Sequence, residues 1–213
     1  MTTGLKVLKR RKERPMQKWL SSIILSDHQS VRLDPGAKSK AYFCRRNPVR
    51  VDHQLLMELK EIARGIGDRN VRLCLHESPE AAFHQMIILE HRGKYYRPHK
   101  HLTKGEAYHL IEGEMAVFVF DEDGRVADAC RLDPRGNFLY RVGPNMYHGV
   151  MPLTALVLYH ESKPGPFLGD ADSVYPSWAP EASDTDGIAE YTQRVLQALE
   201  VMGAGMPPLG TGR

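Results

Sequence analysis

The stretch that decides the fold is GKYYRPHKHLTKGEAYHLIEG, which occupies residues 93–113. His99 and His101 lie one residue apart, so in an extended segment their side chains project to the same face. After the short turn LTKG comes the segment EAYHLIEG, in which Glu106 and Tyr108 share a face. If that face lines the interior of a barrel, two imidazoles and one carboxylate converge there from adjacent strands.

Two neutral imidazoles and one carboxylate suit a divalent first-row ion such as Fe, Zn, Ni or Mn. A third imidazole is available from His148 in RVGPNMYHGV, either as a fourth ligand or as a structural histidine that caps the next strand. A histidine pair at this spacing is by itself often an accident of surface or core. The full pattern, Gly-x5-His-x-His-x4-Glu-x6-Gly, fixes five positions, and a chance match is on the order of 10⁻⁴. We therefore predict one divalent transition metal ion bound by His99, His101 and Glu106, with His148 as a candidate fourth ligand.

Short segments with an alternating or apolar pattern surround this stretch and are separated by glycine and acidic turns. Many short strands at such spacing are typical of an antiparallel sandwich or barrel. One segment is a predicted hairpin with its turn at residues 121–124. The predicted strands lie in RLCLHES, AFHQMIILEHRG, MAVFVFDEDGRVADACRL, NFLYRV and ALVLYHES.

Two helices are predicted outside the strands. Asp52 caps the first, whose apolar residues recur at helical spacing and which ends near Gly65 and Gly67. The second is amphipathic and follows Asp186. We expect four parts: a basic, partly irregular lead-in (1–50), a β-barrel domain (51–185), a C-terminal helix (186–202) and a flexible tail (203–213).

Composition and charge narrow the classes of function. The formal charge of +3 is concentrated in residues 1–14, which hold six lysines and arginines against Glu13. No aromatic residues are interleaved there for base stacking and no recognition-helix pattern occurs, so no nucleic-acid partner is expected. No apolar run approaches the ~20 residues needed to span a bilayer, so no membrane partner is expected. Three cysteines far apart in the sequence favour reduced thiols and a cytoplasmic location.

The spacing of the histidine stretch is that of the first motif of the cupin superfamily, which the chain resembles. The segments LCLHES, GKYYRPHKH, FVFDEDGRV, YHESKPGPF and WAPEASD resemble more narrowly the WbuC-type cupin metalloproteins, over residues 52–185. This resemblance implies a jelly-roll β-barrel, the same four metal ligands and an association with bacterial surface-polysaccharide synthesis. It also implies a homodimer, since cupin barrels often pair through their outer strands.

The second cupin motif, Gly-x5-Pro-x-Gly-x2-His-x3-Asn, is only partly matched. His148 is in place, but Asn145 stands at a glycine position, Gly143 at the proline and Pro152 at the asparagine. Asparagine tolerates left-handed backbone angles better than most residues. We therefore expect the turn before His148 to be retained.

Three further residues are candidates for catalysis. His160 and Glu161 lie where a strand leaves for a loop, and only one of them can face inward. Either is a candidate acid or base at the pocket mouth; a salt-bridged rim is the alternative. Tyr108 shares the face of Glu106 and either donates to a metal-bound ligand or fills the barrel.

Three classes of function remain open. The first is a metal-dependent enzyme acting on a small polar molecule, such as an isomerase or epimerase of a sugar or nucleotide sugar. The second is an Fe(II) dioxygenase, and the third is a non-enzymatic ligand-binding or sensory cupin. The fold cannot choose between them, because function depends on the residues of the pocket.

Overall fold

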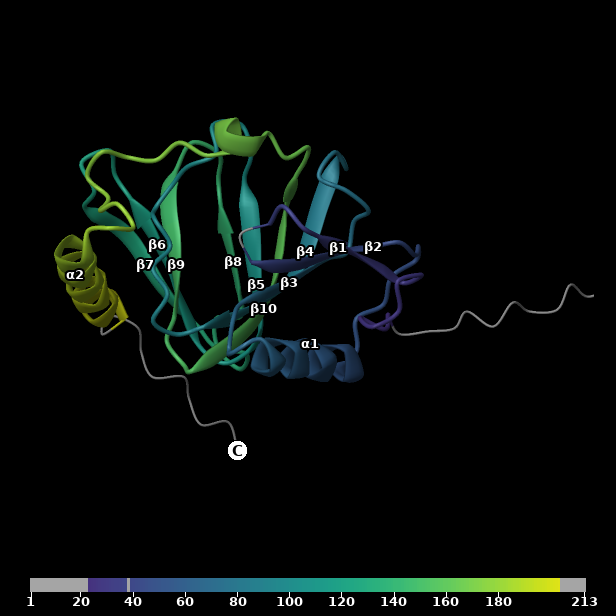
Figure 1. The fold of residues 1–213 in the computed structure, drawn as a ribbon. Coiled ribbons are helices and arrows are strands. Elements are labelled where there is room, and N and C mark those ends of the chain that lie inside the picture. The colour runs from purple at the N-terminus through teal and green to yellow at the C-terminus, as the bar shows by residue number, and fades with distance from the viewer. Residues whose placement is uncertain (1–22, 38, 204–213) are drawn as a thin grey trace, which may run out of the picture.

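The computed structural model describes residues 23–37 and 39–203, and these form two facing β-sheets with one helix against the outside of each (Figure 1). The basic segment 1–14 and residues 204–213 of the predicted tail lie outside the described residues. The larger sheet has the order β1 (Val31–Asp34), β2 (Lys40–Cys44), β3 (Val71–Cys74), β4 (Phe83–His91), β10 (Leu156–Pro164), β5 (Glu106–Glu112) and β8 (Leu139–Val142). The smaller has the order β7 (Val126–Leu132), β6 (Met115–Phe120) and β9 (Tyr147–Pro152).

All strand pairs are antiparallel except β2–β3, and the helix α1 (His53–Gly65) explains this exception. Parallel neighbours need a crossover connection, which α1 supplies between β2 and β3. The carboxylate of Asp52 caps the helix by accepting a hydrogen bond from the Leu55 backbone N–H at 3.1 Å. Gly67, with a φ of 77°, follows its end. The predicted helix and its cap are confirmed.

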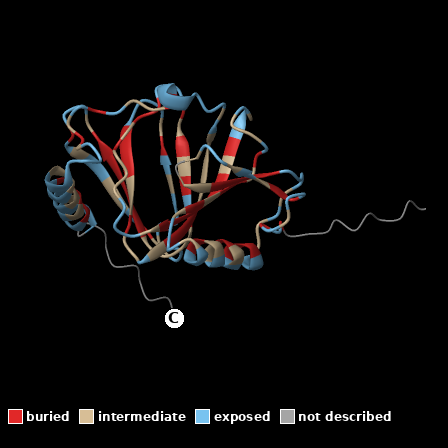
Figure 2. Ribbon diagram, viewed as in Figure 1, coloured by how far each residue is buried: buried red, intermediate tan, exposed pale blue. Residues whose placement is uncertain are grey.

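Within the described residues, the buried apolar side chains form three clusters, one inside the barrel and one beneath each helix. Figure 2 shows where along the strands and helices the buried residues lie. Leu55, Leu59 and Ala63 of α1 pack on the outer face of the larger sheet. The second helix, α2 (Thr185–Gly203), packs Tyr191 and Val195 on the outer face of the smaller sheet. The third cluster fills the space between the two sheets. The strand β6 is buried on both faces, which accounts for its continuous apolar sequence MAVFVF.

The architecture is a mainly β, jelly-roll barrel with an N-terminal and a C-terminal helix, as predicted. The hairpin β6–β7 is also confirmed. Its turn is held by Asp121, whose carboxylate accepts hydrogen bonds from the backbone N–H groups of Asp123 and Arg125. Over the described residues no helix has the length and apolar character needed to cross a bilayer.

Three predictions about local structure were incomplete. The strands β1 and β2 lie in a region that the sequence pattern described only as an irregular lead-in. The segment carrying His99 and His101 is extended, but it is joined to its neighbours by isolated bridges, His99 to His148 and Lys100 to Val174, and forms no regular strand. The last helix begins at Thr185, before the predicted Asp186.

Candidate metal centre

Three separate segments bring four donor side chains together at one end of the barrel interior. His99 exchanges backbone hydrogen bonds of 3.0 and 2.9 Å with His148, the second residue of β9. His101 follows on the same extended segment, and Glu106 is the first residue of β5. One donor atom from each of these four residues lies within 4.8 Å of the others.

Backbone carbonyl groups orient all three imidazoles. The Nδ1 atoms of His99, His101 and His148 lie 3.3, 2.5 and 2.8 Å from the carbonyl oxygens of Arg97, Asp172 and Met146, respectively. A carbonyl oxygen only accepts, so each Nδ1 carries a proton, and in the neutral ring Nε2 retains its lone pair. Hydrogen bonding of the second nitrogen is the usual way in which proteins fix a metal-binding histidine.

The carboxylate of Glu106 faces two of these lone pairs. Its Oε1 lies 2.5 Å from Nε2 of His148, and its Oε2 lies 3.4 Å from Nε2 of His101. His101, Glu106 and His148 are buried, each at most 3% exposed. A buried carboxylate against imidazole lone pairs is repulsive unless a positive charge lies between them.

One nitrogen of the cluster is left without a hydrogen bond. Nε2 of His101 is fully buried and has no hydrogen-bond partner among the described residues. Such orphaned polar atoms are rare in folded proteins and call for an explanation. A cation bound between the four donors would satisfy this nitrogen and remove the repulsion, so the residues present fit a divalent metal.

The electrostatics of His99 and Glu106 favour the protonation states that bind metal, whereas at His101 burial alone would lower the pKa but contact with Glu106 raises it. Burial lowers the pKa of His99 to about 4, and His148 acts in the same direction. Burial alone would raise the pKa of Glu106, but its contacts with His101 and His148 and the nearby Lys163 lower it well below its ordinary value. At neutral pH His99 is therefore neutral and Glu106 is ionised, as metal ligation requires.

Two further side chains contact Glu106. The hydroxyl of Tyr108 donates a hydrogen bond to its Oε1, and the ammonium of Lys163 lies 3.4 Å from its Oε2. Lys163 also pairs with Glu161 at 3.1 Å. Sequence reasoning missed Lys163 because the predicted strand was ended at Ser162. The available signal was alternation, since Lys163 has the same parity as Tyr159 and Glu161 on β10.

The structure separates the two candidates at the end of β10. A cavity of about 460 Å³ opens beside the donor cluster, and its lining includes His99, Glu106, Tyr108 and Glu161. His160 is absent from this lining and lies on the opposite face of the strand, across from His109. Glu161 therefore faces the cavity and His160 does not.

The buried ion pair of Lys104 and Asp172 lies next to the ring of His101. Asp172, whose carbonyl group binds the His101 ring, also accepts from Lys104 and from the backbone N–H of Leu168. Asp172 ends the short 3-10 helix η1 (Gly169–Asp172), which lies above one end of the barrel (Figure 1). Nothing in the local sequence around Asp172 pointed to this role, because the contact spans 71 positions.

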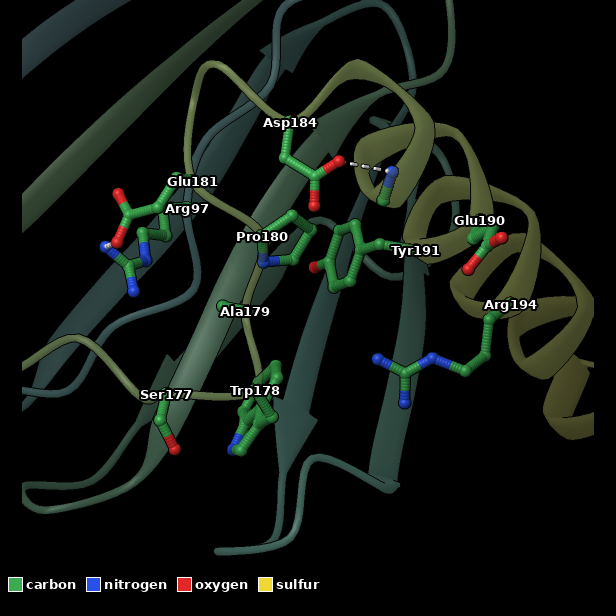
Figure 3. Close-up of a pocket in the computed structure, with 11 residues that line it drawn as sticks. Arg97, Ser177, Trp178, Ala179, Pro180, Glu181, Asp184, Glu190, Tyr191 and Arg194 are labelled. Atoms are coloured by element: carbon green, nitrogen blue, oxygen red, sulfur yellow. Dashed lines mark hydrogen bonds and ion pairs between the residues drawn. The ribbon is translucent and has the colours of Figure 1, made fainter.

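A second cavity, of about 510 Å³, lies between the segment before α2 and the helix itself (Figure 3). Asp184 points toward the first turn of α2 and accepts a hydrogen bond from the Gly187 backbone N–H at 2.9 Å. Arg97 pairs with Glu181 at 2.5 Å on the other side. None of the four clustered donors lines this cavity, so we place the candidate site in the first one.

The turn before His148 is formed as expected. Asn145 has a φ of 58°, in the left-handed region where glycine stands in the general motif. Its backbone N–H donates to the carbonyl oxygen of His101 at 2.7 Å. This turn holds His148 against the segment that carries the other two histidines.

Comparison with known proteins gives a family model and distant structural neighbours. A model described as a domain of unknown function, DUF6016, matches residues 51–132. No curated protein matches this chain. Among solved structures, ligand-free L-ribose isomerase from Cellulomonas parahominis is 16% identical, with a TM-score of 0.41, over 50% of this chain and 69% of the isomerase.

Two further structures match over a smaller share of their own length. CapF with the inhibitor 3-isopropenyl-tropolone is 11% identical, with a TM-score of 0.42, over 51% of this chain and 31% of CapF. Oxalate decarboxylase from Bacillus subtilis at pH 4.6 is 15% identical, with a TM-score of 0.40, over 50% of this chain and 27% of the decarboxylase. The matched region is less than a third of either protein. Function has to be argued from the site.

Proposed function

We propose that this protein is a mononuclear metal-binding cupin and a metal-dependent enzyme that acts on a small polar molecule. One observation carries the proposal: three imidazoles with their Nδ1 atoms on backbone carbonyls and one buried carboxylate each offer a donor atom, and these atoms lie within 4.8 Å of one another. His99, His101, Glu106 and His148 would hold one divalent Fe, Zn, Ni or Mn ion. Such an ion would polarise a carbonyl oxygen of the substrate.

The surrounding side chains suit proton transfer. Glu161 lines the cavity as a carboxylate held by Lys163, and is our candidate acid or base. Burial alone would lower the pKa of Lys163, but Glu161 and Glu106 raise it above its ordinary value, so the ammonium stays charged. Tyr108 is fully occupied by Glu106 and orients that ligand. The reaction class supported by these groups is isomerisation or epimerisation next to a carbonyl group.

The finer part of the proposal rests on sequence resemblance. The WbuC-type segments suggest a sugar or nucleotide-sugar intermediate of bacterial surface-polysaccharide synthesis. A cavity of about 460 Å³ has the size of a small-molecule site and favours the sugar over the larger nucleotide sugar. A cytoplasmic location is proposed on the unpaired thiols of Cys44, Cys74 and Cys130.

Metal content tests the proposal directly. The protein as isolated should carry close to one equivalent of a transition metal by elemental analysis, and the double variant His99→Ala, His101→Ala should carry little. The matched control is His28→Ala, His53→Ala, which changes two exposed histidines. Full metal retention by the His99, His101 variant would contradict the proposed ligand set.

A second measurement tests the reaction class. Aldoses, ketoses and nucleotide sugars are incubated with the metal-loaded protein in D₂O, and deuterium exchange next to the carbonyl is followed by NMR. Glu161→Gln should slow exchange by ~10²-fold or more while metal content stays unchanged. Oxygen consumption by the iron-loaded protein without such exchange would support the dioxygenase in place of the isomerase.

A further inference from the structure

The wall of the cavity formed by β3 and β4 carries two charged residues that take no part in the metal cluster. Arg72 on β3 pairs in register with Ile88 on β4, and Glu90 is two residues further along β4. All three residues line the cavity of about 460 Å³. Diagonal neighbours on one face of an antiparallel pair lie ~7–8 Å apart. No ion pair between Arg72 and Glu90 is present in the described part of the chain.

Glu90 presents an acceptor to the cavity. Its side chain is buried, with the residue 7% exposed, and Oε2 has no hydrogen-bond partner among the described residues. Burial raises the pKa of Glu90 to about 7, although contacts with the hydroxyls of Tyr96 and Tyr159 lower it. An unpaired carboxylate oxygen in such a place is costly unless a donor reaches it.

Arg72 presents a donor to the same cavity. Its Nε is fully buried and has no hydrogen-bond partner within residues 23–37 and 39–203. A guanidinium group binds a carboxylate through two parallel hydrogen bonds, and Nε is one of the atoms used. Lys94, Arg97 and Lys163 add further positive charges to the lining.

The two side chains describe a ligand with one anionic end and neighbouring hydroxyl groups. The anion would pair with the guanidinium group of Arg72, and a hydroxyl would donate to the carboxyl group of Glu90. Bound metal would add further positive charge to the chamber, which again favours an anion. A cavity of this volume accommodates a molecule of sugar size.

We propose that Arg72 and Glu90 form a substrate subsite that selects small polyhydroxylated carboxylates, with the carboxylate on Arg72 and a hydroxyl on Glu90. This inference rests on the proposed function, because it treats the metal cluster as the reacting end of the same cavity.

Calorimetric titration of the Zn²⁺-loaded protein tests the subsite with three six-carbon probes. D-Gluconate carries both groups, sorbitol lacks the carboxylate, and hexanoate lacks the hydroxyls. We expect gluconate to bind at least roughly tenfold more tightly than either of the other two, as expected for a buried hydrogen bond to a charged group. Equal affinity for gluconate and sorbitol, or no gluconate binding, would overturn the proposal.

Variants of Arg72 and Glu90 test which side chain binds the carboxylate of the ligand and which binds a hydroxyl group. Arg72→Gln should abolish the preference for gluconate over sorbitol, and Arg72→Lys should restore part of it because the positive charge returns. Glu90→Gln should abolish the preference for gluconate over hexanoate. Arg69→Gln, which changes an exposed arginine nearby, is the control and should leave both preferences unchanged. Thermal unfolding and metal content of each variant are measured in parallel.

The outcomes separate this subsite from the metal centre. If the parent prefers gluconate but the His99→Ala, His101→Ala variant retains its metal, the proposed metal ligands are contradicted and the subsite is supported. If the parent contains stoichiometric metal but Arg72→Gln leaves the ligand preferences unchanged, the subsite is contradicted and the metal centre is supported. Tighter binding of sorbitol 6-phosphate than of gluconate would replace the carboxylate by a phosphate and overturn the stated class.

Discussion

Two stacked imidazoles, those of His76 and His84, lie beside the barrel interior with ring centroids 4.2 Å apart and planes 1° from parallel. Nδ1 of His76 lies 3.2 Å from the backbone nitrogen and 3.1 Å from the carbonyl oxygen of Gln85. Burial lowers the pKa of His76 to about 4, with His84 and Arg72 acting in the same direction and the Gln85 carbonyl group and Glu77 opposing. A neutral ring is therefore built into the fold at this position.

This shift makes stability depend on pH. The folded pKa of His76 lies below the ordinary value of 6.5, so the unfolded chain takes up the proton first as the pH falls. The contribution of His76 to the free energy of unfolding should be constant above about pH 7. It should decrease by roughly 2–3 kcal/mol between pH 6.5 and 4. Chemical denaturation across this range should show a smaller decrease for His76→Gln. His28→Gln should behave as the parent, and an unchanged decrease in His76→Gln would contradict the assignment.

The residue scale also shows how far spacing predicts a site. The spacing of His99, His101 and Glu106 is enough to predict that their side chains meet, because alternation along extended backbone and one turn bring the three together. The parts of the site that spacing did not reveal are joined only by the folded chain. Lys163 reaches Glu106 across 57 positions, and Asp172 reaches His101 across 71.

At the scale of elements, the two glycines that bracket the histidine stretch have different surroundings. Both have positive φ angles, 87° at Gly93 and 85° at Gly113. A Cβ atom at Gly93 would meet nothing within 4 Å, whereas one at Gly113 would lie 2.5 Å from the carbonyl oxygen of Leu156 and 2.6 Å from Oγ1 of Thr154. Gly113 is thus a packing position between β5 and β10, and Gly93 is only a turn.

Alanine at these positions should separate the two effects. Gly93→Ala should cost about 1 kcal/mol of unfolding free energy, from the left-handed backbone alone. Gly113→Ala should cost a further ~1–3 kcal/mol, because backbone at Leu156 has to move. Urea denaturation measures both, and equal losses would show that the contact at Gly113 relaxes freely.

Most strands could be predicted because each has one face in the core and one outside, or two buried faces. The strands β1 and β2 could not, since VRLD and KAYFC are short and lie at the end of the sheet. Their pairing depends on the crossover through α1, which is a tertiary feature. At His99 and Lys100 the sequence could predict extended backbone but not isolated bridges, because side chains alternate in the same way with or without a regular ladder.

At the scale of the whole molecule, we predict a homodimer formed through outer strands. The strands β1 and β8 stand at the two ends of the larger sheet, and each exposes a leucine, Leu33 at 48% and Leu139 at 56%. Light scattering should give twice the mass of the chain. Leu33→Glu or Leu139→Glu should dissociate the pair, while Val201→Glu on α2 should not. A monomeric mass for the parent would contradict the prediction.

The apolar clusters beneath α1 and α2 affect which residues of the protein can be substituted without loss of stability. Much of its apolar packing lies on the far sides of the sheets, away from the chamber. Residues that line the chamber can therefore be substituted while the packing beneath α1 and α2 continues to stabilise the fold. New specificities should be accessible on this scaffold without rebuilding it.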